Sequence, residues 1–110
     1  MERRVSLRAR TDFKVIAREG SLGSHCRGIE ISPTGIIIDR GRPIVRRDEG
    51  VLVRLELMLP ERLRAVLAVA RPVWSFGTQQ ALRFVRISDA DRLTLAEHLD
   101  LVCLRGATLQ

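Results

Sequence analysis

The segment from Val51 to Leu59 constrains the fold of this chain more than any other. Every second residue is apolar, and Arg54 and Glu56 lie between them. Because successive side chains of a strand point to opposite faces, this period of two predicts a strand with one face in an apolar core. Pro60 ends the pattern.

Period-two alternation recurs in short segments that are separated by turns rich in Gly, Ser and Pro. We predict further strands over residues 13–18, 25–31, 35–39, 63–69, 73–76 and 81–87, with a break at Pro72. The turn Ser32-Pro33-Thr34-Gly35 is typical of a hairpin, and we expect glycine there to supply a positive φ.

A single helix is expected to follow, over about 88–104, with Ser88 as its N-cap and Asp91 in its first turn. Its core face is predicted to carry Leu93, Ala96, Leu99, Val102 and Cys103. Short strands followed by one helix predict a mainly β fold, a small antiparallel barrel. We expect one domain over 11–106, preceded by a flexible arginine-rich arm over 1–10.

Composition limits the function. The chain has 110 residues and a net charge of +6, and all of its basic residues except Lys14 are arginine, which favours an anionic partner. No apolar run approaches the roughly 20 residues of a membrane helix, so we expect a cytoplasmic protein. Cys26 and Cys103 are expected to be free thiols; a metal site with His25 and His98 is the less favoured alternative.

Enzymatic chemistry is not expected, because the sequence has no nucleophile elbow, Walker loop, dinucleotide-binding glycine motif or HExxH. The aromatic residues could stack on nucleic-acid bases, but their segments are rich in core residues. We therefore interpret most of them as core and expect no sequence-specific nucleic-acid binding; they are Phe13, Trp74, Phe76 and Phe84.

Two short motifs carry the functional prediction. The first is Arg4-Val5-Ser6-Leu7-Arg8, and the second is Glu30-Ile31-Ser32-Pro33-Thr34-Gly35. Their order and spacing resemble the RxxxR and (D/N)xSxxG motifs of PilZ domains, the bacterial receptors for cyclic di-GMP. The strand Pro72-Val73-Trp74 and the final strand that runs into a helix are also similar to that family. The resemblance implies a six-stranded barrel with a terminal helix.

The resemblance also implies the site. Arg4 and Arg8 would bind phosphate or the O6/N7 edge of guanine, with Arg3 as a third cation. Ser32 would contact a phosphate or base edge, and Gly35 would shape the turn. Glu30 stands where the family has Asp or Asn, and its carboxylate would accept guanine N–H groups with weaker affinity.

We therefore predict a stand-alone cyclic di-GMP receptor, with no cofactor besides this ligand, that takes part in motility or biofilm regulation. Binding would order the arm and change the surface offered to a partner protein. The alternative is a degenerate PilZ domain that binds no nucleotide and acts as a protein–protein adaptor. A third hypothesis is a nonspecific polyanion binder, whose affinity for anionic ligands would fall steeply as the salt concentration rises.

Overall fold

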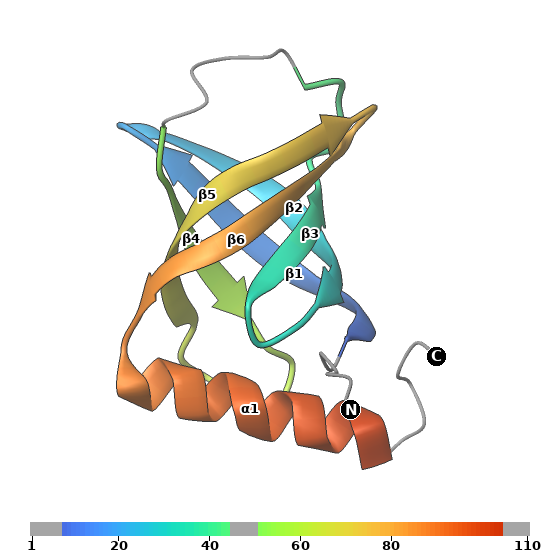
Figure 1. Ribbon diagram of the computed structural model, residues 1–110, viewed down its shortest axis with the longest axis vertical. Helices are drawn as coiled ribbons and strands as arrows, with labels where there is room; N and C mark the ends of the chain where they lie inside the picture. Colours follow the sequence, from blue (N-terminus) through green and yellow to red (C-terminus); the bar gives the residue numbers. More distant parts are fainter. Residues whose placement is uncertain (1–7, 45–50, 105–110) are drawn as a thin grey trace, which may run out of the picture.

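The computed structural model of this chain describes residues 8–44 and 51–104. Along this part of the chain, six strands precede one helix (Figure 1). They are β1 (Ala9–Glu19), β2 (Leu22–Ile31), β3 (Gly35–Asp39), β4 (Val53–Met58), β5 (Val66–Phe76), β6 (Gln79–Ile87) and α1 (Asp89–Leu104). The strands pair antiparallel and close into a barrel in the order β1-β2-β3-β6-β5-β4. The predicted barrel with a C-terminal helix is confirmed.

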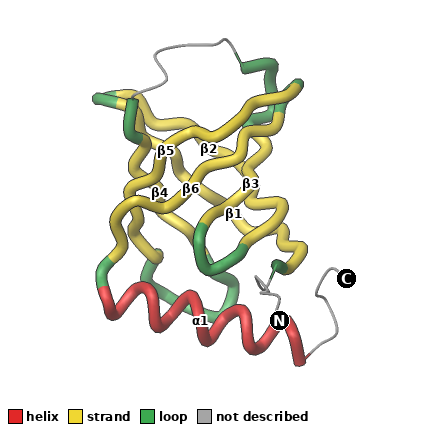
Figure 2. Tube along the Cα trace, viewed as in Figure 1, coloured by secondary structure: helices red, strands yellow, loops and turns green. Residues whose placement is uncertain are grey.

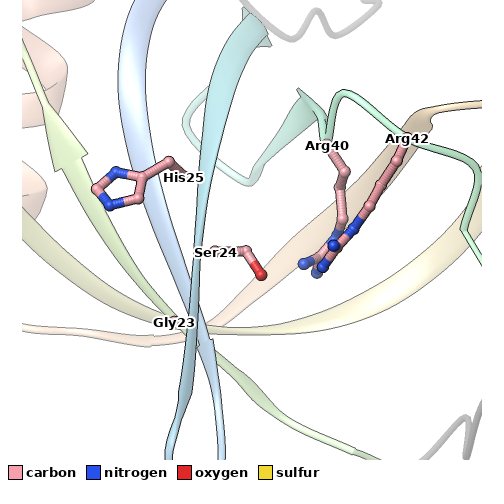
Figure 3. A pocket seen from close by; sticks show the side chains of 5 residues that line it. All are labelled: Gly23, Ser24, His25, Arg40 and Arg42. Atoms are coloured by element: carbon pink, nitrogen blue, oxygen red, sulfur yellow. The ribbon is translucent and has the colours of Figure 1, made fainter.

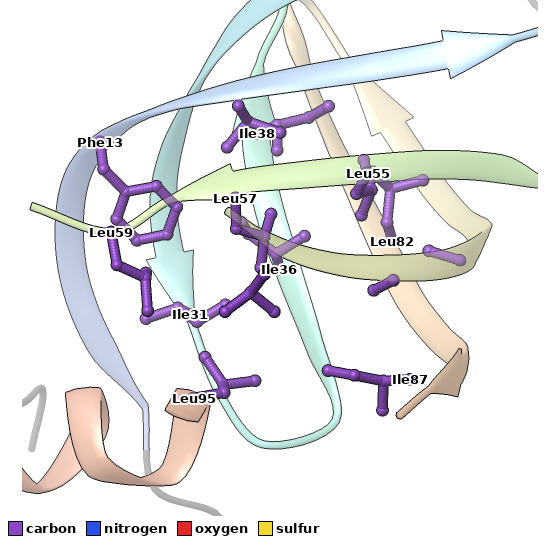
Figure 4. Packing of buried hydrophobic residues seen from close by; sticks show 14 of the residues in the cluster. Phe13, Ile31, Ile36, Ile38, Leu55, Leu57, Leu59, Leu82, Ile87 and Leu95 are labelled. Carbon is purple, nitrogen blue, oxygen red and sulfur yellow. The ribbon is translucent and has the colours of Figure 1, made fainter. Parts of the chain in front are cut away.

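The period of two in the sequence corresponds to the inner and outer faces of this barrel. On β4, Val53, Leu55 and Leu57 are buried, whereas Arg54 is exposed between them. Branched aliphatic side chains from all six strands fill the interior (Figure 4). Their burial is the main source of stability, at roughly 25 cal/mol per Å² of apolar surface.

The helix α1 lies across one end of the barrel (Figures 1 and 2). Ser88 caps it as predicted, because its Oγ accepts a hydrogen bond from the Asp91 N–H at 3.1 Å. The predicted core face was partly wrong. Leu93 is 61% exposed and Ala96 is also exposed, whereas Leu95 is buried.

A polar residue within the buried face explains this error. His98 is 6% exposed and sits among the core residues of α1. Its Nδ1 lies 2.7 Å from Oε2 of Glu61, and its ring packs edge-on against Phe13 with centroids 5.8 Å apart. A histidine that is buried in this way interrupts the apolar periodicity from which a helix face is read.

The predicted break at Pro72 was also wrong. Strand β5 runs through it, and the pairing with β6 shifts by one residue between Pro72 and Trp74. Such a bulge accommodates the missing N–H of proline and turns the following side chains to the other face. Trp74 and Phe76 are therefore 44% and 84% exposed, not core residues as predicted, while Phe13 is buried.

The boundaries of two predicted segments differ from the structure. Ala9 and Arg10, which we expected in the arm, belong to β1 and pair with Ile31 and Glu30. Residues 1–7 of the expected arm lie outside the described residues. Strand β5 begins at Val66, so the predicted strand over 63–69 starts too early.

Candidate ligand-binding site

Arg8 and Glu30 meet at the helix end of the barrel. Arg8 directly precedes β1, and Glu30 stands near the end of β2, opposite Arg10. The Arg8 Nε lies 3.1 Å from Glu30 Oε2, and the two side chains are 58% and 17% exposed. Exposed ion pairs contribute little to stability, about 0–1 kcal/mol. The predicted site residues Arg3 and Arg4 lie outside the described residues.

The Glu30 carboxylate has unused acceptor capacity. Its Oε2 is buried and has no hydrogen-bond partner among the described residues, although Arg8 is within ion-pair distance. The attraction between the two groups is thus Coulombic rather than an aligned hydrogen bond. A buried carboxylate oxygen without a donor is costly, so a ligand N–H at this point would be favourable.

The turn after Glu30 is held by Ser32. Its Oγ accepts hydrogen bonds from the N–H groups of Thr34 and Gly35, each at 3.2 Å. The Ser32 N–H in turn donates to the Gly35 carbonyl at 3.0 Å. The serine hydroxyl therefore already organises the turn, which begins two residues after Glu30.

Gly35 is required for close packing and not for an unusual φ. The positive-φ glycines of the described residues are Gly20, Gly41 and Gly77, so our expectation for Gly35 was wrong. A Cβ on Gly35 would lie 2.4 Å from the Leu82 carbonyl oxygen of β6, well inside van der Waals contact.

Cross-strand pairing places further candidate residues on the outer face beside this turn. Gly35 pairs with Arg83 on β6, which pairs with Arg71 on β5. Both arginines are exposed. Sequence reasoning missed them, because only the register of β3, β6 and β5 brings them next to Gly35.

A second row starts at Glu30. It pairs with Ile37, then Ala81, and finally Trp74. Neighbouring strands lie about 4.8 Å apart, so Glu30 and Trp74 are separated by roughly 14 Å along the outer surface. The two rows form one surface with a carboxylate, two guanidinium groups and an exposed indole ring. Such a surface suits a ligand that has both anionic groups and planar rings.

The alternative metal site has no structural support in the described residues. They contain no cluster of three or more His, Cys, Asp or Glu side chains that could hold a metal ion. His25 is exposed, whereas the neighbouring Cys26 points into the core. Burial raises the pKa of the Cys26 thiol, and the positive charge of Arg40 offsets part of that shift.

Comparison with solved structures identifies the fold. The inhibitor of motility MotI/DgrA from Bacillus subtilis superposes with a TM-score of 0.81 at 19% identity, over 96% of this chain and 53% of that one. The PilZ domain of CeSA from a cellulose-synthesizing bacterium gives a TM-score of 0.66 at 13% identity, over 90% of this chain and 97% of that domain. This chain has a PilZ-like fold.

The PilZ-like fold confirms the fold that the sequence motifs implied. The chain spans about half the length of the Bacillus subtilis protein. No protein-family model and no curated protein matches the sequence. Among the described residues, no helix has the length and apolar character needed to cross a membrane.

Proposed function

We propose that this chain is a cyclic di-GMP receptor domain of the cytoplasm that has no catalytic activity of its own. The observation that carries the proposal is the contact between Arg8 and Glu30 beside the Ser32–Gly35 turn. These residues come from two motifs far apart in the sequence, and they lie together at the helix end of the barrel. The PilZ-like fold supports the same assignment.

In this proposal the ligand binds by breaking the ion pair between Arg8 and Glu30. Arg8 leaves Glu30 and takes a phosphate or a guanine edge of the ligand, together with Arg4. The buried Glu30 oxygen then accepts guanine N–H groups. Arg83 and Arg71 add positive charge on the neighbouring strands.

Ligand capture would fold the segment of Arg3 and Arg4 onto the barrel. The new surface would be recognised by a partner protein, in a pathway such as motility or biofilm control. The Bacillus subtilis neighbour is an inhibitor of motility, which supports this class of pathway.

The test is calorimetric titration with cyclic di-GMP at physiological salt, with cyclic di-AMP and GTP as control ligands. We expect saturable binding of cyclic di-GMP alone. Arg8→Ala should weaken it at least tenfold, since a charge-assisted hydrogen bond contributes about 1.5–3 kcal/mol. Arg62→Ala is the matched control, because Arg62 forms an ion pair with Glu97 on α1. Equal affinity of the Arg8→Ala and wild-type proteins would overturn the proposal.

The adaptor alternative is favoured by the residue at position 30, because a glutamate stands there in place of the family's Asp or Asn. A Glu30→Asp variant separates the two functions. The shorter side chain reaches Arg8 less well and restores the family motif, so a weakened receptor should gain affinity. Absence of cyclic di-GMP binding in both forms would favour the adaptor hypothesis over the receptor.

A further inference from the structure

A polar pocket lies at the end of the barrel opposite α1. Its volume is about 270 Å³, and it is lined by Gly23, Ser24, His25, Arg40 and Arg42 (Figure 3). The turns between β1 and β2 and between β5 and β6 also lie at this end (Figure 1). The Ser32–Gly35 turn is at the helix end, so this pocket is separate from the candidate cyclic di-GMP site.

Arg40 is the buried cation of this pocket. Its side chain is 9% exposed, and its Nε and Nη2 donate to Gln80 Oε1 at 3.0 and 2.7 Å. Gln80 is neutral. Glu19 supplies a carboxylate 3.4 Å from Nη2, but its side chain is 41% exposed. Within residues 8–44 and 51–104, Glu19 is the one ion-pair partner of Arg40, and a buried guanidinium with such a long, half-solvated ion pair gains from a further anion.

Arg42 is a second arginine that lines this pocket. Gly41, at φ 78°, reverses the chain between the two arginines, and its N–H is held by Asp39 Oδ1 at 2.7 Å. Both arginines line this pocket, and Figure 3 shows their side chains and the Ser24 hydroxyl on the same side of β2. The His25 ring lies on the other side of β2. Two like charges that line one pocket repel each other, and an anion bound in that pocket reduces this cost.

We propose that Arg40, Arg42 and Ser24 bind a phosphate group, either as the free ion or on a small molecule. Guanidinium forks match phosphate oxygens two at a time, and the serine hydroxyl supplies one more donor. The volume is below the roughly 300–1,000 Å³ of drug-sized ligand pockets. The pocket therefore suits inorganic phosphate or a small phosphomonoester.

The test is a titration of the ¹⁵N-labelled full chain with inorganic phosphate, followed by NMR, with chloride exchanged to hold ionic strength constant. We expect saturable shifts of the Ser24, Arg40 and Gly41 amides. Arg42→Gln should weaken binding about tenfold, the size expected for one charge-assisted contact. Arg42 is exposed, so this variant leaves the core intact. A parallel titration with glycerol 3-phosphate shows whether the pocket has the higher affinity for the free ion or for a phosphomonoester.

The matched control is Arg64→Gln, which removes the same charge from an exposed arginine between β4 and β5. It should leave phosphate affinity within about twofold of wild type, as surface substitutions usually do. Equal weakening by both variants would mean that net charge alone attracts phosphate, and it would overturn the proposal. Absence of saturable shifts in the wild-type chain would do the same. Neither result depends on Arg8 or Glu30, so the receptor proposal is tested separately.

Discussion

Replacing Gly35 with alanine tests both the fold and the candidate site. The new Cβ would lie 2.4 Å from the Leu82 carbonyl oxygen and 3.3 Å from the Arg83 Cα. The contact with the Leu82 oxygen must lengthen by about 1 Å to reach van der Waals distance. The atoms that the new Cβ would meet on Leu82 and Arg83 belong to the backbone, so a change of side-chain rotamer cannot relieve the overlap. Strand β3 must therefore move away from β6 at its first residue, where the Phe84 N–H also donates to the Thr34 carbonyl at 2.9 Å.

The cost can be worked from these contacts. Overpacking costs about 1–3 kcal/mol, and the loss of one backbone hydrogen bond adds about 1 kcal/mol. Alanine restricts the unfolded chain and returns about 0.4–1 kcal/mol. We expect a net loss of about 1–3.5 kcal/mol in the free energy of unfolding, or roughly 4–15 °C in Tm for a domain of this size.

Urea unfolding followed by far-UV circular dichroism measures this loss. Gly20→Ala is the control, because Gly20 has open space around its Cβ position and a φ of 64°. It should cost about 1 kcal/mol through backbone strain alone and leave cyclic di-GMP affinity unchanged. Gly35→Ala should lower both stability and affinity, since the Ser32–Gly35 turn moves with β3. A Gly35→Ala protein within about 0.5 kcal/mol of wild type would refute the close approach of β3 to β6.

Two further predictions concern the helix and the core. In urea titrations, Leu95→Ala should lower the free energy of unfolding by about 2–5 kcal/mol and Leu93→Ala by less than about 0.5 kcal/mol, because the two leucines are 1% and 61% exposed. Equal effects of the two variants would contradict the packing of the Leu95 face of α1 against the barrel. Cys26 should be alkylated far more slowly in the folded than in the urea-unfolded chain, as mass spectrometry of its peptide can show, because burial raises its pKa and keeps it as the thiol. Since the pKa of Cys26 is raised on folding, the thiol's contribution to stability is fully present below the unfolded pKa of about 8.5 and is lost as the pH rises through the folded pKa. A free energy of unfolding that rises with pH in that range would contradict the burial of Cys26.

Several elements of the fold could be predicted because their signals are local. The alternation around β4, the Ser88 cap and the hairpin at Ser32–Gly35 each depend on residues within a few positions of one another. The wrong predictions share a different cause. The exposure of Trp74 depends on a bulge between two strands, and the face of α1 depends on a histidine that the barrel buries.

The candidate site divides in the same way. The barrel class could be predicted from the sequence, and Arg8, Glu30, Ser32 and Gly35 could be recognised as motif residues, because strand periodicity and motif spacing are local properties of the chain. Which residues share a surface could not be predicted in this way, since the register of paired strands depends on all strands of the barrel at once. The ion pair of Arg8 with Glu30, the rows beside it and the arginine pocket at the far end follow from that register and from the closed barrel.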